Sequence, residues 1–135
     1  MSATLAIIAR NAALDAITAL LANGFARAYT GAKPATPQLA ATGTLLFQLG
    51  LAATAFGAAA NGVATANAIS NDASADATGT AGYLRLFKSD GTTAVQDLDI
   101  GGTAQSTTGE FQMATSSVVL GAIISCSSFT LTLPQ

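Results

Sequence analysis

Only 9% of the residues in this chain are charged, whereas half of the chain is apolar. Average soluble domains carry about a quarter charged residues. The apolar half is rich in alanine rather than in leucine or phenylalanine, so the surface must consist largely of Thr, Ser, Ala, Asn and Gly. Charge keeps dispersed proteins apart in solution. The composition therefore predicts a surface that is normally covered by copies of the same chain or by a partner protein.

The length of 135 residues fits one domain that buries roughly two-thirds of its unfolded surface. We expect a single domain over residues 1–135, with a helix over about residues 3–22 and a β-sandwich over about residues 25–135. Ser2 or Thr4 can cap the start of the helix. Gly24 has the position expected of a left-handed residue that ends it.

Apolar residues at helical spacing form a stripe along this predicted helix. We predict that the stripe contributes to an interface between subunits, through Ile7, Arg10, Leu14, Ile17 and Leu21. Arg10 is unusual in such a stripe. Its aliphatic stem can cover apolar neighbours while its charge stays in water, or its guanidinium can pair with a carboxylate of a neighbouring subunit.

After Gly24 the sequence changes to short alternating segments separated by turn residues. The strands that we predict cover residues 25–30, 44–51, 62–69, 79–88, 92–100 and 111–114, with one long or two shorter strands in 118–133. Residues 52–60 are predicted to form a loop, and Asp90-Gly91 a hairpin turn. Strands at this spacing favour a mainly-β sandwich or a partly closed barrel. We also expect the loops at 31–43 and 70–78 to contact other subunits.

Candidate catalytic and metal-binding groups are few. The chain contains no His, and its single Cys126 allows no internal disulfide and reads as a small packed hydrophobic residue. Asp97 and Asp99 share one face of a strand and could bind Ca²⁺ or act as an acid–base pair. The simpler interpretation is that both are solvated on the outer face of an edge strand.

Asp72 and Asp76 resemble turn residues more than a calcium loop, since the regular ligand spacing is absent. We therefore expect no catalytic residue, no cofactor and no metal, and classify the chain as not an enzyme.

Nucleic-acid and membrane partners are also not expected. The formal net charge is −2 and the isoelectric point is about 4.5, and the five cations are scattered. No secretory signal is expected, because the first cation, Arg10, lies inside the apolar run rather than before it. The uncharged stretch 34–71 is interrupted by Gln48, Gly50 and Gly57, which argues against a membrane span.

Three segments carry a family resemblance: RNAALDAITALLANGFARAYTGAKPAT (10–36), NAISNDASADATGTAGYLRLFKSDGTTAVQDLDIG (67–101) and TTGEFQMATSSVVLGAIISCSSFTLTLP (107–134). Together they resemble a family of small virion proteins of tailed phages and prophages, which we associate with capsid decoration, or cement, proteins. The resemblance covers most of the chain but rests on patterns rather than on a sharp motif. It implies a jelly-roll-like body and symmetric clusters on the capsid exterior, and it transfers no individual functional residue.

The expected function is therefore that of a structural virion protein, assembled in the host cytoplasm and located on the capsid surface. Its expected partners are the major capsid protein and itself, as a dimer or a trimer. The alternatives are a tail or baseplate subunit, or a receptor- or glycan-binding virion module.

Overall fold

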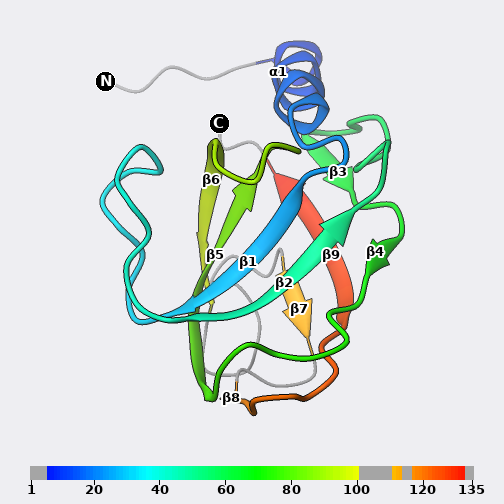
Figure 1. Cartoon of the computed structure of the whole chain (residues 1–135). Coiled ribbons are helices and arrows are strands. Elements are labelled where there is room, and N and C mark those ends of the chain that lie inside the picture. Colours follow the sequence, from blue (N-terminus) through cyan, green and yellow to red (C-terminus); the bar gives the residue numbers. More distant parts are fainter. Residues whose placement is uncertain (1–5, 101–110, 114–116, 133–135) are drawn as a thin grey trace.

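The computed structural model describes residues 6–100, 111–113 and 117–132 (Figure 1). One helix precedes a series of short strands. The elements are α1 (Ile7–Ala19), β1 (Phe25–Thr30), β2 (Leu45–Leu51), β3 (Val63–Thr65), β4 (Ile69–Ser70), β5 (Gly79–Phe87), β6 (Ala94–Asp99), β7 (Phe111–Met113), β8 (Ser117–Val118) and β9 (Cys126–Thr132).

The strands form two antiparallel sheets. The first sheet has the order β4-β2-β1-β5-β6, with β8 paired to the start of β5, and the second has the order β3-β9-β7. The expected mainly-β fold with one N-terminal helix is thus confirmed. The hairpin predicted at Asp90-Gly91 joins β5 to β6, and Gly91 takes a positive φ of 71° there.

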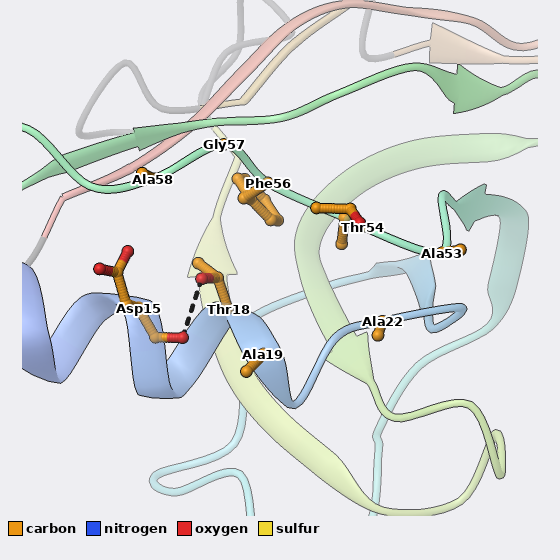
Figure 2. Close-up of a pocket in the computed structure, with 10 residues that line it drawn as sticks. Asp15, Thr18, Ala19, Ala22, Ala53, Thr54, Phe56, Gly57 and Ala58 are labelled. Atoms are coloured by element: carbon orange, nitrogen blue, oxygen red, sulfur yellow. Dashed lines mark hydrogen bonds between the residues drawn. The ribbon is translucent and has the colours of Figure 1, made fainter.

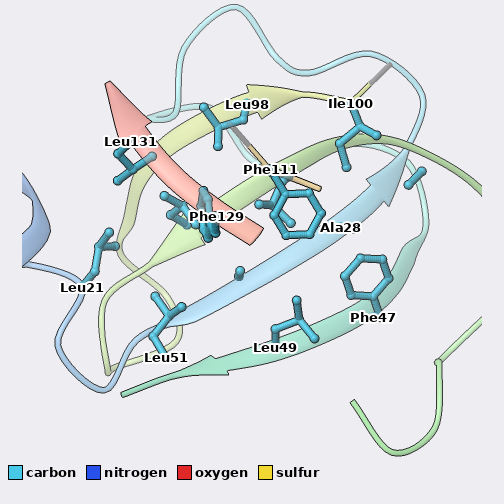
Figure 3. Close-up of a cluster of buried hydrophobic side chains, with 14 of the residues drawn as sticks. Leu21, Ala28, Phe47, Leu49, Leu51, Leu98, Ile100, Phe111, Phe129 and Leu131 are labelled. Atoms are coloured by element: carbon cyan, nitrogen blue, oxygen red, sulfur yellow. The ribbon is translucent and has the colours of Figure 1, made fainter. Parts of the chain in front are cut away.

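The main core lies between the two sheets (Figure 3). Ala26 and Ala28 face it from the central strand β1 and are fully buried. Their small side chains leave room for aromatic rings, and Phe129 of β9 makes edge-on contacts with the rings of Phe111 and Phe56 at 5.3 and 5.4 Å. Such edge-to-face pairs are a favoured aromatic geometry. Leu21, which follows α1, also belongs to this buried cluster.

The other face of the first sheet is covered as well. From Tyr83 to Phe87 every residue of β5 is buried. Leu84 and Leu86 belong to the main core, while the alternate residues point to the opposite face. There the loop at 31–43 folds over the sheet, and the Arg85 Nη1 donates a hydrogen bond to its Leu39 carbonyl at 2.8 Å. Burial on both faces explains why large side chains follow one another without alternation from Tyr83 to Phe87, with Arg85 as the one charged residue among them.

One strand prediction needs correction. The segment 62–69, predicted as one strand, is divided between β3 in the second sheet and β4 in the first. It crosses between the sheets at Ala66, whose N–H donates to the Phe129 carbonyl. For the segment 118–133, the prediction left open one long strand or two shorter ones, and the structure has two, because a tight turn follows Val118. The loop predicted at 52–60 is confirmed, apart from isolated bridges at Phe56 and Ala60.

The helix is shorter than predicted. It runs from Ile7 to Ala19, and its N-cap is Ala6, which makes no side-chain capping hydrogen bond. The predicted caps Ser2 and Thr4 lie outside the described residues. Asn23, with φ of 55°, takes the left-handed conformation that we expected at Gly24. Across the described ranges, no helix combines the length and the apolar character needed to cross a bilayer.

Candidate interaction surface

The predicted interface stripe is divided between the core and the surface. Leu14 and Leu21 are buried inside the chain, at 2% and 0% exposure. Ile17 is half-buried, and Ile7 is 49% exposed. The C-terminal half of the stripe thus attaches α1 to its own sandwich, and only the N-terminal half remains accessible to another molecule. Ile8, which the stripe did not include, is 80% exposed beside it.

Arg10 is held against the turn that precedes β3. Gly62 in this turn has a φ of 75°, and a Cβ there would collide with the Arg10 guanidinium. Two other helix residues fix the same turn, since Asn11 Oδ1 accepts from the Gly62 N–H and Asp15 Oδ1 from the Ala59 N–H, each at 2.8 Å. The Arg10 Nε is buried, and the described part of the chain offers it no hydrogen-bond partner. A buried donor without a partner is costly.

A shallow pocket lies between α1 and the loop at 53–58 (Figure 2). Its volume is about 360 Å³, and its lining includes Asp15, Thr18 and Phe56. The Thr18 hydroxyl donates a hydrogen bond to the Asp15 backbone carbonyl, at 3.2 Å. Asp15 is the one acidic side chain in the lining, and no group of three His, Cys, Asp or Glu residues suited to a metal occurs among the residues the structure describes. The pocket therefore offers no acid–base pair.

On another side of α1, an apolar groove runs between the helix and the ends of β6 and β9. We call it the helix groove; its volume is about 290 Å³, and it is lined by Leu14, Ile17, Leu20, Val95, Gln96, Leu131 and Thr132. Leu20 is 47% exposed at its rim. No charged side chain belongs to the lining.

The most exposed apolar cluster outside α1 lies on the turn between β8 and β9. We call residues 119–123 the apolar tip, because Val119, Leu120 and Ile123 are 59, 64 and 74% exposed. Gly121 takes a φ of 84°, and the Ala122 N–H donates to the Val119 carbonyl at 3.0 Å, which closes the turn. The tip lies at the opposite end of the molecule from α1 (Figure 1).

Hydrogen bonds to the 70–78 loop hold the apolar tip in place. Gly121 and Ala75 are joined by an N–H to carbonyl bond of 2.9 Å, and Ala75 donates in turn to the Ala122 carbonyl at 2.8 Å. The Leu120 N–H donates to the Thr78 hydroxyl. Three aliphatic side chains are thus presented to solvent on a fixed backbone, which lowers the entropy lost when a partner covers them.

The two aspartates in this loop have different roles. Asp72 is a turn residue, as predicted, since its carboxylate accepts hydrogen bonds from the Ser74 N–H and from the Gln48 N–H. Asp76 follows Ala75, which is bonded to the tip, and is exposed.

The prediction of a solvated carboxylate at position 97 is wrong. The Asp97 side chain is only 4% exposed, and its two oxygens accept hydrogen bonds from the Nε and Nη2 of Arg85 at 2.7 and 3.0 Å. Arg85 and Asp97 are directly opposite in the β5–β6 register. The hydrogen bond to Asp97 raises the pKa of the Arg85 guanidinium, although burial opposes the shift. Nothing is described for the Asp99 side chain.

Arg27, on the same face of the sheet, is also used internally. Its guanidinium lies 4.6 Å from the centre of the Phe87 ring, and it donates hydrogen bonds to Gln48 Oε1 and to the Gly91 carbonyl. Cys126 is half-buried and packs against the core, as predicted.

Sequence reasoning missed the apolar tip as an interaction surface and assigned it to strand. The available signal was Gly121, a glycine between large aliphatic residues, which is typical of a turn or a bulge.

No protein-family model, no curated protein and no solved structure matches the chain significantly.

Proposed function

We propose that this protein is a structural virion component that decorates the capsid and stabilises the head shell as an oligomer. One observation carries the proposal: a surface with few charges exposes aliphatic side chains in two separate places. These are the apolar tip and the N-terminal half of α1 with Ile7 and Ile8.

The physical argument concerns what covers these side chains. Exposed apolar patches in soluble proteins usually mark interaction sites, and a low charge gives little protection against association. A protein that occupies a regular lattice is surrounded by fixed neighbours, which bury such patches. Two patches at opposite ends of one chain are suited to a subunit that contacts more than one neighbour.

The resemblance of residues 10–36, 67–101 and 107–134 to tailed-phage virion proteins supports the same proposal. The proposed partners are the major capsid protein and other copies of this chain, as a dimer or trimer at the two- or threefold positions of a shell. Binding to the assembled shell but not to its dissociated subunits stabilises the shell by mass action. The proposal includes no catalysis and no cofactor.

The test is the number of copies in purified particles. Quantitative mass spectrometry of virions should find this chain in a fixed ratio to the major capsid protein, and particles assembled without it should release their DNA at lower temperature. A copy number of a few per particle would overturn the proposal and favour a tail or baseplate subunit. Absence from particles would exclude both.

A further inference from the structure

We propose that the apolar tip of one copy docks into the helix groove of a second copy. The contact would be head to tail, because its two halves are different surfaces at opposite ends of the molecule (Figure 1). Such heterologous contacts build rings or open chains rather than closed pairs.

Shape and polarity match between the two surfaces. The tip is a protruding turn with Leu120 and Ile123 more than half exposed, whereas the groove is a depression of about 290 Å³. Leu14, Ile17, Leu20, Val95 and Leu131 line most of the groove, so aliphatic side chains entering it would exchange water for apolar contacts. Neither the tip nor the groove lining carries a charge that would be left unpaired.

Charges beside the two surfaces are complementary. Asp76 is exposed next to the tip and has no side-chain hydrogen bond within the described residues. Arg10 lies one helical turn before Leu14 and against Gly62, and the following residue, Val63, pairs with Thr132 of the groove. Arg10 is half-buried rather than fully buried, so its positive charge can attract the exposed Asp76 carboxylate of a second copy, and the charges and the apolar contact favour the same docking.

The contact is a property of the isolated chain, whereas its role on a capsid rests on the proposed function. There it would be the contact that joins neighbouring copies of this chain. Because one turn and one groove of about 290 Å³ form only a small contact, the copies should associate weakly in dilute solution, and the associated fraction should rise with protein concentration.

The experiment exploits the two different halves of the contact. Leu120→Lys disables the tip, and Leu20→Lys disables the groove while placing a cation at a helix C-terminus, where it is tolerated. Sedimentation velocity over a concentration series should show that the wild type forms species larger than dimers. Each variant alone should stay monomeric, with its association weakened at least about tenfold.

An equimolar mixture of the two variants should form dimers that grow no further. In that mixture, only the intact tip of Leu20→Lys can dock into the intact groove of Leu120→Lys. Ala16→Lys is the matched control, since it places the same charge at an exposed position of α1 outside the groove lining and should associate like the wild type. Circular dichroism and thermal melting confirm that each variant is folded.

A charge exchange tests the orientation. Asp76→Arg and Arg10→Asp should each weaken association, and the double variant should restore part of it. A wild type that stays monomeric over the whole series, or a variant mixture that does not dimerise, would overturn the proposal. Groove variants that lose stability while tip variants associate normally would overturn it as well. Shell binding enters none of these measurements, so a failure here is distinct from a failure of the proposed function.

Discussion

Two of the few charged residues of this chain form a buried ion pair, and removing charges from water costs free energy of desolvation. Arg85 and Asp97 face each other across two strands with side chains 3% and 4% exposed. Burying charges is offset only when hydrogen bonding is nearly complete. Here the guanidinium donates twice to Asp97 and once to Leu39, which also attaches the 31–43 loop to the sheet. The pair therefore connects the hairpin with its covering loop.

Asp97→Asn should destabilise the protein by about 3 kcal/mol, because Arg85 would remain as a buried charge without its counterion. The double variant Arg85→Met/Asp97→Leu should recover part of this loss, since it removes both charges together. Urea denaturation of the two variants and the wild type measures the difference. If the double variant is less stable than Asp97→Asn, the cost does not come from the unpaired charge.

Tyr83 fixes the same loop at a second point. Its hydroxyl accepts from the Thr42 N–H at 2.9 Å and donates to the Thr42 carbonyl at 2.7 Å, while its ring stacks on Tyr29 at 5.2 Å. Tyr83→Phe should lower the free energy of unfolding by only about 1 kcal/mol, because Thr42 is exposed and its backbone N–H and carbonyl can hydrogen-bond to water instead. Thermolysin should then cut faster before the exposed Leu39.

Tyr29→Phe is the matched control for this experiment. It keeps the stacked ring, and the described residues show no hydrogen bond from its hydroxyl. It should leave the cleavage rate unchanged. Equal acceleration by both substitutions would mean that ring packing, rather than the Thr42 hydrogen bonds, holds the loop.

At the scale of elements, the β5–β6 hairpin depends on one carboxylate. Asp90 accepts hydrogen bonds from the Thr93 hydroxyl and from the N–H groups of Thr93 and Thr92. The hydrogen bond from the Thr93 side chain is the largest of the causes that hold the pKa of Asp90 well below its usual range. A carboxyl with a lowered pKa adds stability that is complete above its unfolded pKa of about 3.9 and is lost in stronger acid.

Asp90→Ala should therefore lower stability at pH 7, and the difference from the wild type should shrink as the pH falls below about 4. Urea midpoints at neutral and acidic pH measure this. A difference between Asp90→Ala and the wild type that is independent of pH would exclude the carboxylate as the source.

Local sequence patterns predicted the strands whose bounds depend on residues nearby in the sequence. The predicted strand at 25–30 alternates in sequence and forms β1, and the predicted strand at 79–88 is rich in large apolar residues and forms β5, each within one residue of the prediction. The division of 62–69 between two sheets depends on long-range partners in β2 and β9, which no local pattern shows.

The same distinction holds for individual residues. Asn23 and Gly24 can both take a left-handed conformation, and Asn23 is the one that does. Gly24 is required for another reason, since a Cβ there would collide with the Phe87 carbonyl. Asp97 looked solvated because the loop that buries its partner Arg85 lies more than forty residues away in sequence. The candidate site was anticipated in part: the helix stripe was visible from spacing, whereas its division between core and surface required the fold.

At the scale of the whole molecule, the low charge predicts how the protein binds. Most of its exposed large aliphatic residues lie on the apolar tip and on or just after α1, and neither the apolar tip nor the helix groove contains a charged side chain. Binding to shells should therefore be driven mainly by apolar burial, which salt does not screen. Raising the salt from about 0.1 M to about 1 M shortens the screening length from about 10 Å to about 3 Å and would weaken a contact between exposed charges. We expect shell occupancy, measured by co-sedimentation, to stay constant or to rise over this range. A loss of occupancy of about tenfold would mean that exposed charges rather than aliphatic side chains hold the protein on the shell.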